Sequence, residues 1–274
     1  LSLIVTQLLY EVGLYAVSPA LPRTCKVLYA VFKASPASYR AQYLVACIEQ
    51  SHPREDAIIT KLLRYPICSE DVLEAYFRMT PSKAGSRKRW VPELPRHLFR
   101  SLAIKSKSLR SSSAPCVAAR RGRSAGETLP WTELDHPLPL LRYLYTCPHI
   151  HPPAVNSHEG YALTKAVQSG FVPLIQFLLN HGATPDWKSS LAVLIAISRR
   201  DLPMVRMLVE RSETIHALPE GEKVGAKRRR LEDRVSITPK MLRAAVKCKA
   251  QDIIEYFTRE KGCIPDIHTL LMLE

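Results

Sequence analysis

The 274-residue chain lacks any run of about 18 apolar residues, so we expect no membrane-spanning helix. It also lacks a C-x-x-C pair, and its seven cysteines are scattered and odd in number. This distribution is typical of reduced thiols in the cytoplasm or nucleus rather than of a disulfide framework. The apolar amino-terminal stretch has no basic start and contains Gln7 and Glu11, which disfavours a signal peptide. An apolar stripe predicts a buried helix there instead, formed by Leu1, Ile4, Val5, Leu8 and Val12.

Motifs of the common enzyme classes are also missing. The chain has no P-loop, no H-E-x-x-H and no dinucleotide-binding glycine pattern. Residues 122–126 match G-x-S-x-G, but a nucleophile elbow needs a preceding apolar strand, and Ala-Ala-Arg-Arg precedes the motif here. We interpret Ser124 as a phosphorylation site, because arginines precede it closely.

Potential metal ligands gather loosely in one proline-rich stretch. They are Cys147, His149, His151 and His158. The prolines between them favour an ordinary loop over a zinc site. We therefore expect no catalytic residues, no bound metal and no cofactor.

Positive charge is concentrated in one segment of the chain. The formal net charge is +14, and residues 81–126 carry many Lys and Arg side chains against Glu93 alone. Serine-rich, basic sequence with few large apolar groups cannot offset the entropy of folding. We expect 81–130 to be a basic, largely disordered linker, with a short helix over 97–104. Such a linker is either simply solvated or touches polyanions nonspecifically, and no aromatic or zinc pattern supports a specific nucleic-acid reader.

Residues 161–186, YALTKAVQSGFVPLIQFLLNHGATPD, form one unit of a repeating helical pattern. Small and apolar side chains mark a first helix, which Gly170 ends because glycine adopts the left-handed conformation easily. A second apolar helix follows and stops at Gly182. The apolar positions of the two helices are Leu163, Ala166, Val167, Leu174, Ile175, Leu178 and Leu179.

Further copies of the pattern lie on both sides. One begins 30 residues on, where Ala196 takes the place of Ala166 and Arg200 takes the place of the turn glycine. Another lies in ITPKMLRAAVKCKAQDIIEYFTREKG, and residues 138–145 resemble an upstream second helix. The tail IPDIHTLLMLE is expected to start a capping helix. A single unit cannot bury its own apolar face, so an array is expected.

The pattern resembles degenerate ankyrin repeats of the fungal type. The resemblance implies an all-α fold in which 131–274 is an ankyrin-type solenoid; the alternative is a helical bundle with chance periodicity. It also implies a monomeric protein that binds protein partners through its finger loops and first-helix face. Trp187 is the strongest single candidate unless it packs against the neighbouring repeat. The candidate binding residues are His158, Glu159, Tyr161, Asp186, Trp187 and Lys188.

Residues 1–48 are expected to form three short helices, over 4–17, 21–32 and 36–48. Ser35 is a plausible N-cap for the third, with Pro36 at its first position. The sequence Leu21, Cys25-Lys26, Leu28 resembles an F-box, although the usual opening Leu-Pro is absent and the first connection is short; a plain helical cap is the alternative. The resemblance implies docking on the adaptor of a cullin-type ubiquitin ligase. The docking side chains would be Leu8, Leu21, Pro22 and Leu28.

Two further segments complete the organisation. Residues 54–80 read as a helical pair, with Ser69 capping the second helix, and resemble an outlying degenerate repeat. Residues 212–234 read as a loop insertion that carries the basic run Lys227, Arg228, Arg229, Arg230, which is either a nuclear-import signal or solvated charge.

Taken together, the sequence favours a noncatalytic protein-interaction module, cytoplasmic or nuclear, that recruits a substrate to a ubiquitin ligase. The alternative is an ankyrin scaffold or nuclear regulator with no ligase contact.

Overall fold

The computed structural model describes residues 3–50, 58–80, 91–102, 131–211 and 233–266, together with Thr269 and Met272. Within these residues the chain is all-α and contains no strand; Glu93 and Ala154 form one isolated bridge. None of the described helices has the length and apolarity needed to cross a membrane. The chain divides into two compact units. The first unit contains the described residues within 1–101 and 132–157. The second unit contains Leu102, Trp131 and the described residues after 157.

The first unit is built around one helix, α3, which packs against α1, α4 and α5. Its buried side chains include Tyr43 and Leu44, and the Tyr43 hydroxyl donates to the Ser18 carbonyl. The helices of this unit are α1 (Leu3–Ala16), α2 (Lys26–Ala34), α3 (Ala37–Glu49), α4 (Ile58–Leu62), α5 (Glu70–Met79), α6 (His97–Arg100) and α8 (Leu138–Thr146), with a 3-10 turn over Leu21–Arg23.

The predicted burial of the α1 stripe is wrong. Val5, Leu8 and Val12 are 41%, 54% and 53% exposed. The helix packs through its other face: Gly13 is buried, and the Tyr39 hydroxyl donates to the Tyr10 carbonyl at 2.8 Å. A Cβ at Gly13 would lie 2.5 Å from that hydroxyl, so the small residue lets α1 approach. The apolar stripe therefore faces away from the described core.

Of the two predicted serine caps, the structure confirms the position of one. Pro36, not Ser35, occupies the N-cap position of α3, and the Ser35 hydroxyl donates backwards to the Phe32 carbonyl at 2.6 Å. Ser69 is the N-cap of α5 as predicted, but its side chain makes no capping bond. Its hydroxyl instead accepts a hydrogen bond from Arg40 Nη1 at 3.3 Å. In both cases a competing partner takes the hydroxyl away from the helix end.

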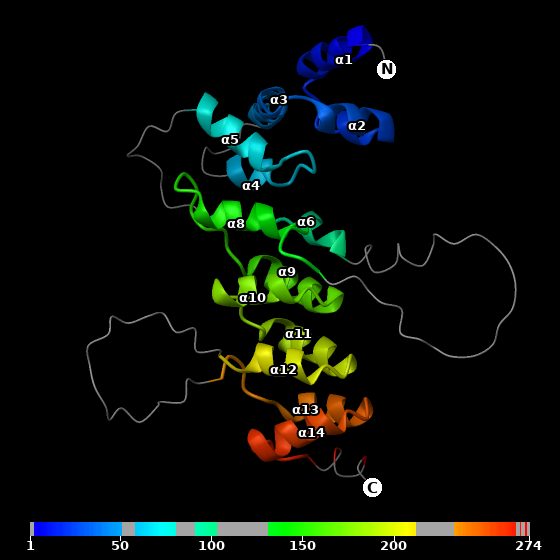
Figure 1. Cartoon of the computed structure of the whole chain (residues 1–274), viewed down its shortest axis with the longest axis vertical. Coiled ribbons are helices and arrows are strands. Elements are labelled where there is room, and N and C mark those ends of the chain that lie inside the picture. The colour runs from blue at the N-terminus through cyan, green and yellow to red at the C-terminus, as the bar shows by residue number, and fades with distance from the viewer. Residues whose placement is uncertain are drawn as a thin grey trace, which may run out of the picture. The chain divides into compact units, whose positions relative to one another are not determined.

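The second unit consists of successive helix pairs, stacked in chain order in Figure 1. In every pair the first helix buries small or aliphatic groups, such as Ala166, Ala196 and Ala245. The pairs are α9 (Ser157–Ser169) with α10 (Val172–Asn180), α11 (Trp187–Ser198) with α12 (Leu202–Val209), and α13 (Pro239–Lys247) with α14 (Gln251–Glu255), which continues as a π-helical turn over Tyr256–Glu260.

The same tight turn ends the first helix of each pair. Its left-handed residue is Gly170 (φ 73°), Arg200 (φ 56°) or Lys249 (φ 53°). In the first pair the Phe171 N–H donates to the Ala166 carbonyl at 3.0 Å, and the Gly170 N–H donates to Val167. The other two pairs repeat both bonds. These are the two hydrogen bonds of a Schellman motif, which satisfy carbonyls at the helix end and turn the chain back.

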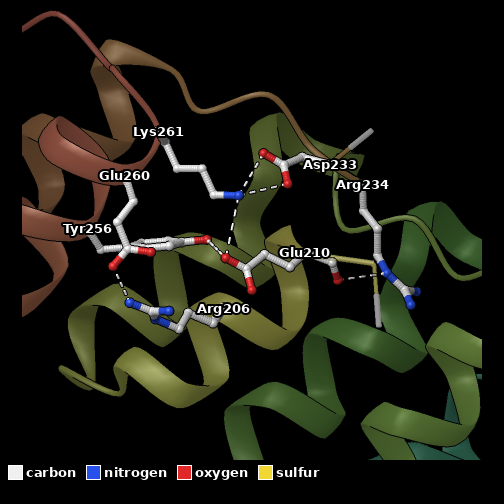
Figure 2. Close-up of polar contacts among 7 residues, drawn as sticks. All are labelled: Arg206, Glu210, Asp233, Arg234, Tyr256, Glu260 and Lys261. Carbon is white, nitrogen blue, oxygen red and sulfur yellow. Dashed lines mark hydrogen bonds and ion pairs between the residues drawn. The ribbon is translucent and has the colours of Figure 1, made fainter. Parts of the chain in front are cut away.

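A polar cluster joins the described residues on either side of 212–232 (Figure 2). Lys261 Nζ lies 2.8 Å from Asp233 Oδ1 and 3.4 Å from Glu210 Oε1. The Tyr256 hydroxyl donates to the same Glu210 oxygen at 2.9 Å. The pKa of Tyr256 is raised, mainly because the hydroxyl is buried and secondly because of this hydrogen bond. The Arg234 backbone N–H donates to the Val209 carbonyl at 2.7 Å. The cluster thus ties α12 to the third helix pair.

The left-handed turns predict opposite effects for glycine at neighbouring lysines. Lys249→Gly should raise the free energy of unfolding by about 1 kcal/mol, because a residue with a Cβ is strained at positive φ. Lys247→Gly, two residues earlier and at the last position of α13, should lower it by up to about 1 kcal/mol. Urea denaturation followed by circular dichroism measures both. Equal destabilisation by the two substitutions would contradict this account of the turn.

Candidate functional site: a candidate protein-binding surface

Two left-handed turns open the first helices of the first two pairs. His158, Glu159 and Gly160 have φ values of 56°, 59° and 68°. Thirty residues later, Lys188–Ser190 repeat the conformation with φ between 56° and 59°. Non-glycine residues rarely adopt this region, and each such residue costs roughly 1–2 kcal/mol. Strain repeated at equivalent positions has to be held by the surrounding contacts.

Hydrogen bonds around Asp186 hold the second of these turns. The Ser190 N–H donates to the Asp186 carbonyl at 3.0 Å, and the Ser190 hydroxyl donates to Asp186 Oδ1 at 3.1 Å. Ser190 itself is only 3% exposed. Its buried hydroxyl is thereby satisfied, and the turn is fixed from inside the fold.

Contacts between the two turns place an aromatic ring at the surface. Trp187 lies against Gly160. A Cβ added at Gly160 would lie 3.1 Å from the indole ring of Trp187 and 3.2 Å from the Trp187 Cβ. Lys188 Nζ forms an ion pair with Glu159 Oε2 at 3.1 Å. Trp187 nonetheless remains 44% exposed. The ring is therefore held from one side and open to solvent on the other.

The structure brings three of the six predicted binding residues together through these contacts: Glu159, Trp187 and Lys188. Asp186 is exposed and acts in the turn, while Tyr161 is half-buried beneath the Lys165 ammonium group, 5.9 Å from its ring centroid. The two expectations for Trp187, a binding residue or a packing residue, are therefore not exclusive. Sequence reasoning missed Gly160 and Ser190, for which the 30-residue spacing of the two turns was the available signal.

The proline-rich stretch before this surface makes ordinary packing contacts. The His149 ring lies 5.4 Å from the Phe77 ring, and the Cys147 thiol lies 3.9 Å from the Tyr143 hydroxyl. Across the described ranges, no three His, Cys, Asp or Glu side chains are placed to hold a metal ion. The surface around Trp187 is suited to noncovalent contact through an aromatic ring flanked by two opposite charges.

The predicted adaptor-binding residues are not equally accessible. Leu8 is exposed, whereas Pro22 is buried and Leu21 and Leu28 are half-buried. The exposed neighbours of Leu8 are Val5 and Val12 on α1, which sequence reasoning had placed in the core. A groove of about 500 Å³ lies between α1 and α2. Its apolar lining includes Tyr10, Val27, Ala30, Val31 and Ala34.

Several predicted features lie outside the described residues. They include Ser124 with its G-x-S-x-G match and the basic run Lys227–Arg230. Of the predicted linker, the structure describes 91–102, where Leu98 and Phe99 of α6 are buried.

No protein-family model, curated protein or solved structure matches the chain.

The contact between Gly160 and Trp187 predicts coupled stabilities. Gly160→Ala should lower the free energy of unfolding by roughly 1–3 kcal/mol, because the new methyl group is strained at positive φ and meets the indole. In a Trp187→Ala background the same change should cost less, with a coupling of about 0.5–1.5 kcal/mol. Chemical denaturation of the four proteins measures the coupling.

Gly182→Ala is the matched control for this cycle. Gly182 has a φ of 87°, and no atom lies within 4 Å of an added Cβ. Its substitution should therefore cost the same with or without Trp187. Additive effects of the Gly160 and Trp187 substitutions would contradict the contact.

Proposed function

We propose that this protein is a noncatalytic binding protein whose second unit is an ankyrin-type stack that captures a protein partner. The observation that carries the proposal is Trp187, supported on Gly160 yet 44% exposed, beside the Lys188–Glu159 ion pair. The repeated helix pairs with the same Schellman turn support the ankyrin resemblance. The surface of such a stack varies while its core repeats, and this suits it to selective binding.

A supported aromatic ring is a favourable anchor for physical reasons. Trp187 already contacts Gly160, so ordering it on binding costs less entropy than ordering a fully free side chain. Its indole offers a large apolar face and one N–H donor. The neighbouring Lys188 and Glu159 can supply charged contacts at the rim of an interface, where they add selectivity more than affinity.

The partner-capture proposal is tested with the full chain. Cross-linking at Ser189, an exposed position two residues after Trp187, identifies the partner, and the purified partner is then titrated against variants. Trp187→Ala should raise the dissociation constant by about 30-fold, equivalent to the ~2 kcal/mol of a hot-spot residue. Tyr15→Ala, at a ring that is 89% exposed on α1, should leave it unchanged. Unaltered affinity of a folded Trp187→Ala protein would refute the proposal, as would loss of its helical signal.

We further propose that the first unit docks on the adaptor of a cullin-type ubiquitin ligase, as its F-box resemblance implies. The observation in favour is the exposed apolar stripe of Val5, Leu8 and Val12 on α1. Exposed aliphatic side chains along one helix face are unfavourable in water unless a partner covers them. If no adaptor binds, the alternative remains a scaffold or nuclear regulator without ligase contact.

A single charge on each face of α1 tests adaptor docking. Leu8→Glu should weaken binding to purified adaptor by at least about tenfold, because the interface would bury an unpaired carboxylate. Gln7→Glu adds the same charge at a neighbouring exposed position of the same helix and should have little effect. Affinity is measured by calorimetry with the full chain. Equal weakening by both substitutions, or no binding by the unaltered chain, would overturn the ligase proposal.

A further inference from the structure

A small cavity of about 250 Å³ opens between the ends of α10 and α12. Three arginines contribute to its lining, and two amide side chains of α10 face it as well. These residues present many N–H donors and few acceptors in a small volume. The lining residues that matter are Gln176, Asn180, Arg206, Glu210, Arg211 and Arg234.

Arg234 is fixed in place by backbone carbonyls rather than by a carboxylate. Its Nε donates to the Glu210 carbonyl at 3.2 Å, and its Nη1 donates to the Leu179 carbonyl at 3.0 Å. Among the described residues, no partner is shown for Nη2. Burial, followed by the positive charge of Arg211, lowers the pKa of the Arg234 guanidinium. Its charge is thus oriented by the fold but not neutralised there.

Glu210 is the one acidic residue among the lining residues, and its carboxylate contacts Tyr256 and Lys261. The carboxylate of Glu210 accepts from the Tyr256 hydroxyl and lies 3.4 Å from Lys261 Nζ, as Figure 2 shows. Only its backbone carbonyl reaches Arg234. The Glu210 carboxylate is therefore engaged within the polar cluster, where it shares the Lys261 ammonium group with Asp233.

The third arginine is held rigidly at the edge of the cavity. Arg206 pairs with Glu260, and its guanidinium carbon lies 4.7 Å from the centroid of the Tyr256 ring. Such stacking fixes the plane of the guanidinium. Arg211, two residues beyond the end of α12, is exposed. The cavity thus combines two oriented guanidinium groups, of Arg234 and Arg206, with the exposed guanidinium group of Arg211.

We propose that this cavity binds the phosphate of a phosphorylated side chain on a partner peptide. A phosphate dianion has three acceptor oxygens, and guanidinium groups match its geometry with paired N–H donors. A carboxylate has only two oxygens, so it would engage fewer of the available donors. The site shares no residue with the surface around Trp187 and extends the function beyond it.

The test uses the full chain and NMR of the arginine Nε–Hε groups at constant ionic strength. The probe is the peptide acetyl-Gly-phosphoserine-Gly-amide, compared with the serine and aspartate versions. The phosphopeptide should give saturable shifts at Arg206 and Arg234. Arg211→Gln should raise its dissociation constant about tenfold, since a charge-assisted hydrogen bond is lost without disturbing a described contact. Trp187→Ala should leave this binding unchanged, which separates it from partner capture.

Arg259→Gln is the matched control, because it removes one positive charge from the same unit at a side chain that is 78% exposed. It should change the dissociation constant less than twofold. Equal effects of Arg211→Gln and Arg259→Gln would show that the phosphopeptide responds only to the net charge of the protein, and would refute the proposed site. Non-saturable shifts, or equal binding of the aspartate peptide, would likewise refute phosphate recognition.

Discussion

The left-handed turn between paired helices is the constraint on which the second unit depends. It bonds the Phe171, Asp201 and Ala250 N–H groups back to Ala166, Ala196 and Ala245. Each bond spans five residues and reverses the chain, so that the second helix returns along the first. The side chains of the alanines that supply the carbonyls are buried. One short motif therefore reverses the chain at a point where the first helix enters the core.

Polar contacts from the later pairs reach back to carbonyls of the earlier ones. Arg199 Nη1 donates to the Gln168 carbonyl at 2.7 Å, and Arg234 Nη1 donates to Leu179 at 3.0 Å. Both acceptors lie near helix ends, where carbonyls have no partner within the helix. The ion pair between Lys188 and Glu159 adds a contact at the opposite end of the same helices. The first helices of the first two pairs are thus joined at both ends, and this holds the strained turns that carry Trp187.

The two proposed binding surfaces of the second unit depend on different kinds of preorganisation. At the Trp187 surface, backbone strain and a glycine contact hold an aromatic ring partly in solvent. At the arginine cavity, backbone carbonyls orient Arg234 without a paired carboxylate, while Glu260 and the Tyr256 ring orient Arg206. In the first unit, the exposed stripe on α1 is instead an apolar surface. These arrangements leave exposed apolar side chains in water, or an arginine without a carboxylate partner. A bound partner could cover the apolar groups or neutralise the charge, and this is the physical reason to propose binding there.

The sequence by itself determined the helices and their order, because apolar periodicity and turn residues act over short distances. It predicted α8, the repeated pairs and the positive φ of Gly170. Only the tertiary structure decided which faces are covered. The α1 stripe had the periodicity of a core helix, yet Gly13 and Tyr10 make the contact, since close approach depends on the Tyr39 ring from α3. Likewise, Arg200 and Lys249 adopt the left-handed conformation without the glycine signal, because the bonds and packing of each pair outweigh a local strain of roughly 1 kcal/mol. The arginine cavity had no local signature, since its residues come from α10, α12 and position 234 and meet only in the folded chain.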